Sequence, residues 1–145
     1  PVSLPDVIPA VIAMPDEAGV LLCPPYAGSV LAPALKALCG APAMCFDRYA
    51  GGQCPLYAAL SAGGVTSGGE ANPFGFIRAI EHLLREEFEM ELEAGCVEAA
   101  VRNVLQAGWR SPDIAVTGLP QLGAEGMTDL LCQQIEVAGE WAGNA

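Results

Sequence analysis

The stretch "SGGEANPFGFIRAIEHLL", Ser67 to Leu84, carries the clearest structural signal in the chain. Asn72 is a residue type that caps helices, and Pro73 suits the first helical turn because its N–H would have no partner there. The apolar residues that follow recur at steps of three and four: Phe76, Ile77, Ile80, Leu83, Leu84 and Phe88. This period predicts a helix that begins after Asn72 and buries one face.

Two more helices are predicted further along the chain. The first runs from about Leu92 to Ala107 and ends at Gly108, because glycine commonly closes a helix. The second covers roughly Gly126 to Val137. The side chains expected to face inward are Cys96, Val97, Ala100, Val101, Val104, Leu105, Met127, Leu130, Leu131 and Ile135.

Two strands are predicted upstream of these helices. The run "DVIPAVIAM", Asp6 to Met14, is short, apolar and β-branched, which favours a buried strand despite Pro9. The run "AMCFDRY", Ala43 to Tyr49, is the second strand, and Ala62 to Gly69 is interpreted as a flexible loop.

The segment from Ala18 to Gly40 is apolar enough to raise the question of a membrane span. Prolines at positions 24, 25 and 33 interrupt it well short of the ~20 apolar residues that a span needs. A buried helix-loop-helix is therefore the preferred interpretation.

Length and charge limit the classes of function. The 145 residues predict a single domain over 1–145, large enough to hold a core. The net charge is −11 with six Lys and Arg, so the chain lacks the basic surface that nucleic acid or an anionic membrane requires. Neither is expected as a partner, although association with a membrane complex stays open.

Charge is distributed unevenly. From Ala18 to Gly69 the only charged residues are Lys36, Asp47 and Arg48, whereas Glu81 to Glu98 contains seven glutamates. A surface with so few charges is hard to keep soluble. We therefore expect protein subunits of a larger assembly to cover much of the apolar half.

Six cysteines lie at positions 23, 39, 45, 54, 96 and 132, with no CxxC pair and no zinc-site spacing. They are interpreted as reduced, buried thiols of a protein in a reducing compartment.

The order of three motifs resembles one enzyme family. "EANPFGFIRAIEHL", "VEAAVRNVLQAGWRSPDIAVTG" and "GAEGMTDLLCQQI" follow one another as in the C-terminal half of the isocitrate/isopropylmalate dehydrogenase family. The resemblance implies an α/β fold, a partial dehydrogenase-like domain with a short sheet and flanking helices. It also implies that Asn72 occupies the position of an asparagine that contacts adenine.

The departures from the family pattern concern its chemistry. The family's metal-binding aspartates correspond here to Val20 and Pro24, neither of which can ligate a hard cation. Its adenine-side histidine corresponds to Ala50, and its substrate arginines and Tyr/Lys pair belong to an N-terminal half outside this chain. The expectation is therefore no catalytic residue, no metal ligand, no cofactor, and Asn72 as a vestigial cofactor contact only.

Other polar residues have ordinary structural interpretations beside functional ones. Asn72 is explained by helix capping alone, and His82 by a solvated surface. The run from Arg85 to Glu93 is a solvated helix end rather than a metal or acid/base cluster. Asp47 and Arg48 are interpreted as facing water, not as catalytic remnants.

On these grounds the sequence predicts a degenerate relative that is not an enzyme: a structural or assembly subunit of a larger mitochondrial complex. The chain begins at Pro1, so a transit peptide removed on the matrix side is one interpretation, and a piece of a longer protein is another. The alternative function is a regulatory or split half of an NAD-dependent isocitrate/isopropylmalate dehydrogenase that a partner chain completes. A stand-alone nucleotide-binding module ranks third.

Overall fold

A computed structural model describes residues 3–15, 19–52, 54–59 and 72–143. Its contacts divide the chain into two compact units, unit 1 with residues 1–42 and unit 2 with residues 43–145. The expectation of a single domain stays a prediction. The loop expected at Ala62 to Gly69 lies outside the described residues.

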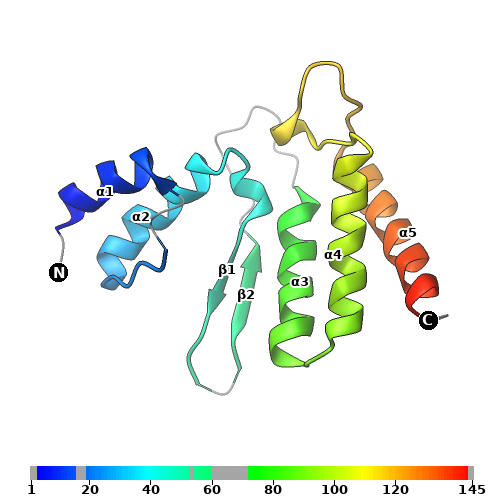
Figure 1. Ribbon diagram of the computed structural model, residues 1–145, viewed down its shortest axis with the longest axis horizontal. Helices are drawn as coiled ribbons and strands as arrows, with labels where there is room; N and C mark the ends of the chain where they lie inside the picture. The colour runs from blue at the N-terminus through cyan, green and yellow to red at the C-terminus, as the bar shows by residue number, and fades with distance from the viewer. Residues whose placement is uncertain (1–2, 16–18, 53, 60–71, 144–145) are drawn as a thin grey trace. The chain divides into compact units, whose positions relative to one another are not determined.

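Within its described residues, unit 1 contains two α-helices that pack on each other, α1 (Leu4–Ala13) and α2 (Pro25–Leu38) (Figure 1). The strand predicted at Asp6 to Met14 is therefore wrong. Its apolar residues also follow a helical spacing of three and four, and Pro5 at the start of α1 favours a helix. Periodicity cannot separate the two structures in so short an apolar run.

The helix-loop-helix expected between Ala18 and Gly40 is a single helix instead. α2 begins at Pro25, where a proline is tolerated, and continues through Pro33. Within the described residues, none of the helices combines the length and apolar character needed to span a bilayer. Among the residues of unit 1 that the structure describes, the buried apolar side chains are Val11 and Leu31.

A short turn of 3-10 helix, η2 (Pro42–Met44), spans the boundary, and unit 2 continues with a hairpin of β1 (Phe46–Tyr49) and β2 (Leu56–Ala59). The strands are antiparallel, with Phe46 opposite Ala59 and Tyr49 opposite Leu56. The strand predicted at Ala43 to Tyr49 is confirmed from Phe46 onward.

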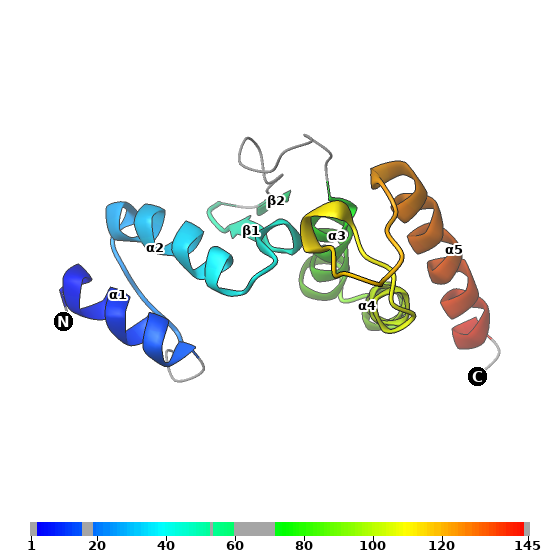
Figure 2. The same cartoon turned by 90° about the horizontal axis from the view of Figure 1, so that it is seen from above.

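In the described residues after the hairpin, unit 2 has three α-helices: α3 (Pro73–Glu87), α4 (Glu91–Gln106) and α5 (Ala124–Gly143). They lie side by side in the order α3, α4, α5, and the hairpin packs against α3 (Figure 1, Figure 2). All three predicted helices are confirmed, and α5 extends beyond its predicted end. The α/β fold with a short sheet and flanking helices is confirmed with them.

The core of unit 2 lies between the three helices. Its buried members are Phe74, Val101, Val104, Met127 and Leu131. The predicted inward face of α3 is partly wrong, because Phe76 and Phe88 are each 60% exposed. α3 is apolar on more than one side, so spacing alone did not identify the buried one.

Gly75 decides how closely the hairpin approaches α3. A Cβ atom at this position would lie 2.5 Å from the Ala43 carbonyl oxygen and 3.0 Å from that of Cys45. Real Cβ contacts are not that short, and backbone atoms cannot rotate away as a side chain can. Glycine at position 75 therefore lets the segment before β1 pack directly on α3.

The cysteines differ from the expectation of buried thiols. Cys39, Cys54 and Cys132 are exposed, and the other three are only half-buried.

Candidate functional site

Asn72 is the centre of a hydrogen-bonded cluster at the start of α3. Its Oδ1 accepts from the Phe74 backbone N–H at 2.9 Å. Its Nδ2 donates to Ser111 Oγ at 3.0 Å and to the two carboxylate oxygens of Asp113 at 3.0 and 2.8 Å. The capping role expected of Asn72 is confirmed, and the same side chain joins α3 to a segment about forty positions later.

Ser111 and Asp113 reach Asn72 because their segment is held in place from both sides. A short 3-10 helix, η3 (Pro112–Ile114), begins directly after Ser111, which is 1% exposed. The Arg110 backbone N–H donates to the Pro120 carbonyl, and the Leu122 N–H donates to the Arg110 carbonyl, each at 3.0 Å. This bridge closes the loop after α4.

The Arg110 side chain stabilises the same loop. Its guanidinium donates to the backbone carbonyls of Leu105 and Trp109, each at 2.8 Å. The Leu105 carbonyl in the last turn of α4 also accepts from the Gly108 N–H at 3.1 Å, so Arg110 adds a second contact at this helix end.

The Asn72 cluster leaves limited capacity for a ligand. Both N–H bonds of the amide are used within the cluster, while Oδ1 has two lone pairs and one recorded donor. Asn72 is half-buried, so a ligand can still reach it. Because both of its N–H bonds are used, that ligand would meet an acceptor and not a donor. Contact with a nucleotide stays a prediction.

The positions that correspond to the family's metal ligands do not fit a metal. Val20 is 97% exposed and carries no oxygen on its side chain, and the exposed Pro24 likewise offers none. Within the described ranges, no group of three His, Cys, Asp or Glu side chains is placed to hold an ion. The lack of a metal site stays a prediction.

Arg48, which was expected to face water, has structural partners. Arg48 donates to Glu87 Oε1 at 2.6 Å and to Tyr57 Oη at 2.9 Å, and the Tyr57 hydroxyl donates to the same Glu87 oxygen at 2.9 Å. Arg48 therefore ties the hairpin to α3 and does not merely face water. The hydrogen bond from Arg48, followed by that from Tyr57, lowers the pKa of Glu87.

The acidic run from Arg85 to Glu93 is confirmed as a helix end and turn. Arg85 pairs with Glu81, with Glu91 at 3.2 Å and with Glu98 at 3.1 Å. Within the run, Arg85 thus pairs with Glu91, and its other two partners flank the run on α3 and α4. The hydrogen bond from Arg85 also lowers the pKa of Glu98, with a further contribution from the charge of Arg102.

His82 is not the solvated surface residue that was expected. Its ring packs on Phe46 with the ring centroids 5.1 Å apart, and its Nδ1 is buried with no hydrogen-bond partner in the described structure. The hairpin covers this side of α3. The sequence gives no signal of that cover, because it depends on a contact between distant segments.

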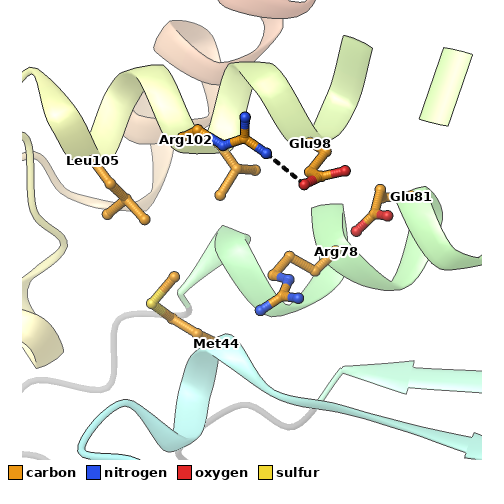
Figure 3. Close-up of a pocket in the computed structure, with 7 residues that line it drawn as sticks. Met44, Arg78, Glu81, Glu98, Arg102 and Leu105 are labelled. Atoms are coloured by element: carbon orange, nitrogen blue, oxygen red, sulfur yellow. Dashed lines mark hydrogen bonds and ion pairs between the residues drawn. The ribbon is translucent and has the colours of Figure 1, made fainter. Parts of the chain in front are cut away.

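A cavity of about 250 Å³ lies between α3, α4 and η2 (Figure 3). Its lining consists of Met44, Arg78, Glu81, Glu98, Val101, Arg102 and Leu105. Arg78 and Arg102 were not recognised as site residues from the sequence. No motif marks them, since they stand on different helices and converge only when α3 and α4 pack.

Comparison with known proteins identifies relatives over most of the chain. The sequence profile described as "Isocitrate/isopropylmalate dehydrogenase" matches residues 6–131. The 3-isopropylmalate dehydrogenase of Moorella thermoacetica is 29% identical over 127 residues, which cover 86% of this chain and 36% of that protein.

Two further relatives have the same name. The 3-isopropylmalate dehydrogenase of Oleidesulfovibrio alaskensis is 37% identical over 75 residues, covering 52% of this chain and 21% of the relative. The enzyme of Aquifex aeolicus is 32% identical over 92 residues, which cover 62% of this chain and 24% of the relative. The chain thus spans about a third or less of the curated relatives it matches.

These relatives correct one expectation. The substitutions at Val20 and Pro24 led to the prediction that the chain is not an enzyme, and this is contradicted because the relatives are named as dehydrogenases. Two altered positions describe one part of a catalytic site. They do not outweigh a match that runs through most of the chain.

Proposed function

The chain belongs to the isocitrate/isopropylmalate dehydrogenase family, and we propose that it forms part of an NAD-dependent dehydrogenase, where it supplies the adenine side of the cofactor site. The observation that carries the proposal is the Asn72 cluster. The asparagine in the family's adenine-contacting position is fixed by Ser111 and Asp113 at the head of an ordered helix.

The chemistry of Asn72 fits adenine in one orientation. The exocyclic amino group of adenine is a hydrogen-bond donor, and the remaining lone pair of Asn72 Oδ1 is an acceptor. Ser111 and Asp113 hold the amide so that its oxygen, and not its nitrogen, is available. NAD, when bound, would supply the hydride acceptor of the reaction. The role of this chain is to orient the adenine end.

The substrate class follows from the relatives, which are named 3-isopropylmalate dehydrogenases. We therefore propose a 2-hydroxy acid of the isopropylmalate type as substrate. Because the chain spans 36% of the Moorella relative, we infer that groups outside residues 1–145 hold the substrate and react with it. Leu22 in unit 1 is 100% exposed, which supports a partner surface that completes the enzyme. A mitochondrial location stays a prediction.

The direct test is a titration of the full chain with NAD, followed by NMR. Saturable shifts at Asn72, Ser111 and Asp113 are expected, with a millimolar dissociation constant because Ala50 replaces the adenine-side histidine. Adenosine should compete, and nicotinamide mononucleotide, which lacks adenine, should not. Equal competition by both compounds, or no saturable shift at ten millimolar NAD, would refute the adenine-side role.

The enzyme as a whole is tested by complementation. The chain is produced together with the part of the Moorella relative that it does not match, and NAD reduction is measured with 3-isopropylmalate. We expect activity above that of either piece alone, and a further increase when Val20 and Pro24 are both changed to Asp. No activity in either combination would contradict a role as part of this enzyme.

A further inference from the structure

The cavity between α3 and α4 is built differently from the Asn72 cluster and shares no residue with it. One side carries Arg78 and Glu81 from α3, the other Glu98 and Arg102 from α4, and Met44 closes one end (Figure 3). Val101 and Leu105 contribute apolar surface. The cavity therefore combines an apolar floor with four charged side chains.

The two carboxylates of this cavity are already compensated. Glu81, which is 4% exposed, pairs with Arg85, and Glu98 pairs with Arg85 and with Arg102 at 2.6 Å. A carboxylate held by guanidinium groups presents little free negative charge to a ligand. Repulsion of an anion by these glutamates is thus largely cancelled.

Arg78 differs from the other cations of the described residues. Arg48, Arg85 and Arg102 are paired with glutamates, Arg110 with backbone carbonyls, and Lys36 also has an interaction. No hydrogen bond or ion pair is recorded for the guanidinium of Arg78 within the described structure. In a chain with 17 acidic and six basic residues, a cation without an acidic partner at a cavity is unusual.

From this arrangement we infer that the cavity binds a small organic carboxylate with an apolar tail. The guanidinium of Arg78 presents parallel N–H donors that match a carboxylate, and Met44, Val101 and Leu105 offer the tail an apolar floor. At about 250 Å³ the space is smaller than the roughly 300–1,000 Å³ of drug-sized sites. A tail of about five to seven carbons is the size that such a space admits.

The test uses the full chain and three unbranched probes that each contain six carbons and differ in the head group: hexanoate, hexanol and hexylammonium. Each is titrated at pH 7 and followed by NMR shifts of α3 and α4. Hexanoate should bind saturably with a millimolar dissociation constant, about tenfold or more tighter than hexanol. Hexylammonium should not bind. Equal affinity of hexanoate and hexanol would overturn the inference, because the tail alone would then explain binding.

A matched pair of variants tests the residue. Arg78→Gln should weaken hexanoate about tenfold and leave hexanol unchanged, whereas Arg48→Gln, which removes a cation outside the cavity, should leave both unchanged. Arg78 is exposed, so its replacement should not disturb the fold, which the spectrum of the free variant verifies. Unchanged hexanoate affinity in Arg78→Gln would refute the site. NAD binding should be the same in all variants, so failure of this site is distinguishable from failure at Asn72.

Discussion

Units 1 and 2 both contain abundant apolar sequence, but they use it differently. Unit 2 places apolar side chains of three helices in one shared core. Unit 1 has two helices, each with an interior proline, and buries Val11 and Leu31 while Val20 and Leu22 are almost fully exposed. The contrast teaches that apolar composition does not make a core. A second layer on which each apolar face can pack is also required.

The contrast has an energetic side. Fully burying an aliphatic side chain contributes roughly 1.5–3 kcal/mol, whereas ordering each residue costs about 1–2 kcal/mol of backbone entropy. Five fully or nearly fully buried side chains form one cluster in unit 2. Two such residues cannot offset the ordering of two helices, so unit 1 is expected to depend on additional contacts for its stability.

The largest test compares the same substitution in both units. Leu131→Ala should destabilise unit 2 by about 3–5 kcal/mol, because a fully buried leucine leaves a cavity, whereas Leu31→Ala should cost unit 1 about 1 kcal/mol. Amide hydrogen exchange, read separately for each unit, measures the change in opening free energy. Equal costs would show that unit 1 has a core as effective as that of unit 2.

A second test sharpens the account of packing within unit 2. Gly75→Ala should destabilise it by about 1–3 kcal/mol, since the added methyl group meets backbone oxygens. Gly95→Ala, within α4 where no atom lies within 4 Å of the new Cβ, should stabilise it by up to about 1 kcal/mol. Urea unfolding of both variants shows whether each substitution lowers or raises the free energy of unfolding. An unchanged free energy of unfolding in Gly75→Ala would mean that the segment before β1 does not pack closely on α3.

The third test compares the helix caps of the two units. Asn72→Ala should cost about 1–2 kcal/mol, because it removes the cap of α3 and leaves Ser111 and Asp113 without their donor. Ser3→Ala at the start of α1 should cost less, since Ser3 makes no capping hydrogen bond. Hydrogen exchange in the first turn of each helix reports both effects. A greater loss of protection in Ser3→Ala than in Asn72→Ala would contradict the stronger capping assigned to Asn72.

The smallest test concerns pH. The folded state lowers the pKa of Glu87, chiefly through Arg48 and then Tyr57, so this carboxylate stabilises the fold above its unfolded pKa. That contribution is lost as pH falls through the lowered pKa. Glu87→Gln should therefore be slightly less stable than the parent at pH 7 and equal to it at low pH. Glu136→Gln, an exposed change on α5, should show the same pH dependence of stability as the parent. If Glu87→Gln also shows the parent's pH dependence, the lowered pKa of Glu87 does not contribute to stability.

The sequence predicted most of unit 2 and little of unit 1, for a physical reason. In α3 and α4, a strong cap at Asn72, helical spacing and a terminating Gly108 all indicate the same structure. Between Asp6 and Met14 these signals conflict, because β-branched residues favour a strand while Pro5 and the apolar spacing favour a helix. Local signals decide a structure only where they agree.

The candidate sites were predictable to the extent that they are local. The capping bond of Asn72 lies within two residues and follows from residue type. Its bonds to Ser111 and Asp113 cross about forty residues, and the approach of Arg78 to the α4 side of the cavity depends on how two helices pack. No spacing rule contains that information. The replacement of the family's metal-binding aspartates by Val20 and Pro24 was visible in the sequence. It indicated less about activity than the match to the family over residues 6–131 does.

The turn between α3 and α4 has a consequence for the order of events during folding. Residues 88–90 connect the helices, Glu89 adopts a left-handed backbone with φ of 55°, and the Met90 N–H donates to the Leu84 carbonyl at 2.9 Å. Helices joined so closely meet without closing a long loop, and such local contacts form fast. The contact between Ala43 and Gly75 closes a much longer loop, which consists of the residues between these two positions. Pulse-labelled refolding should therefore protect α3 and α4 first and the hairpin later.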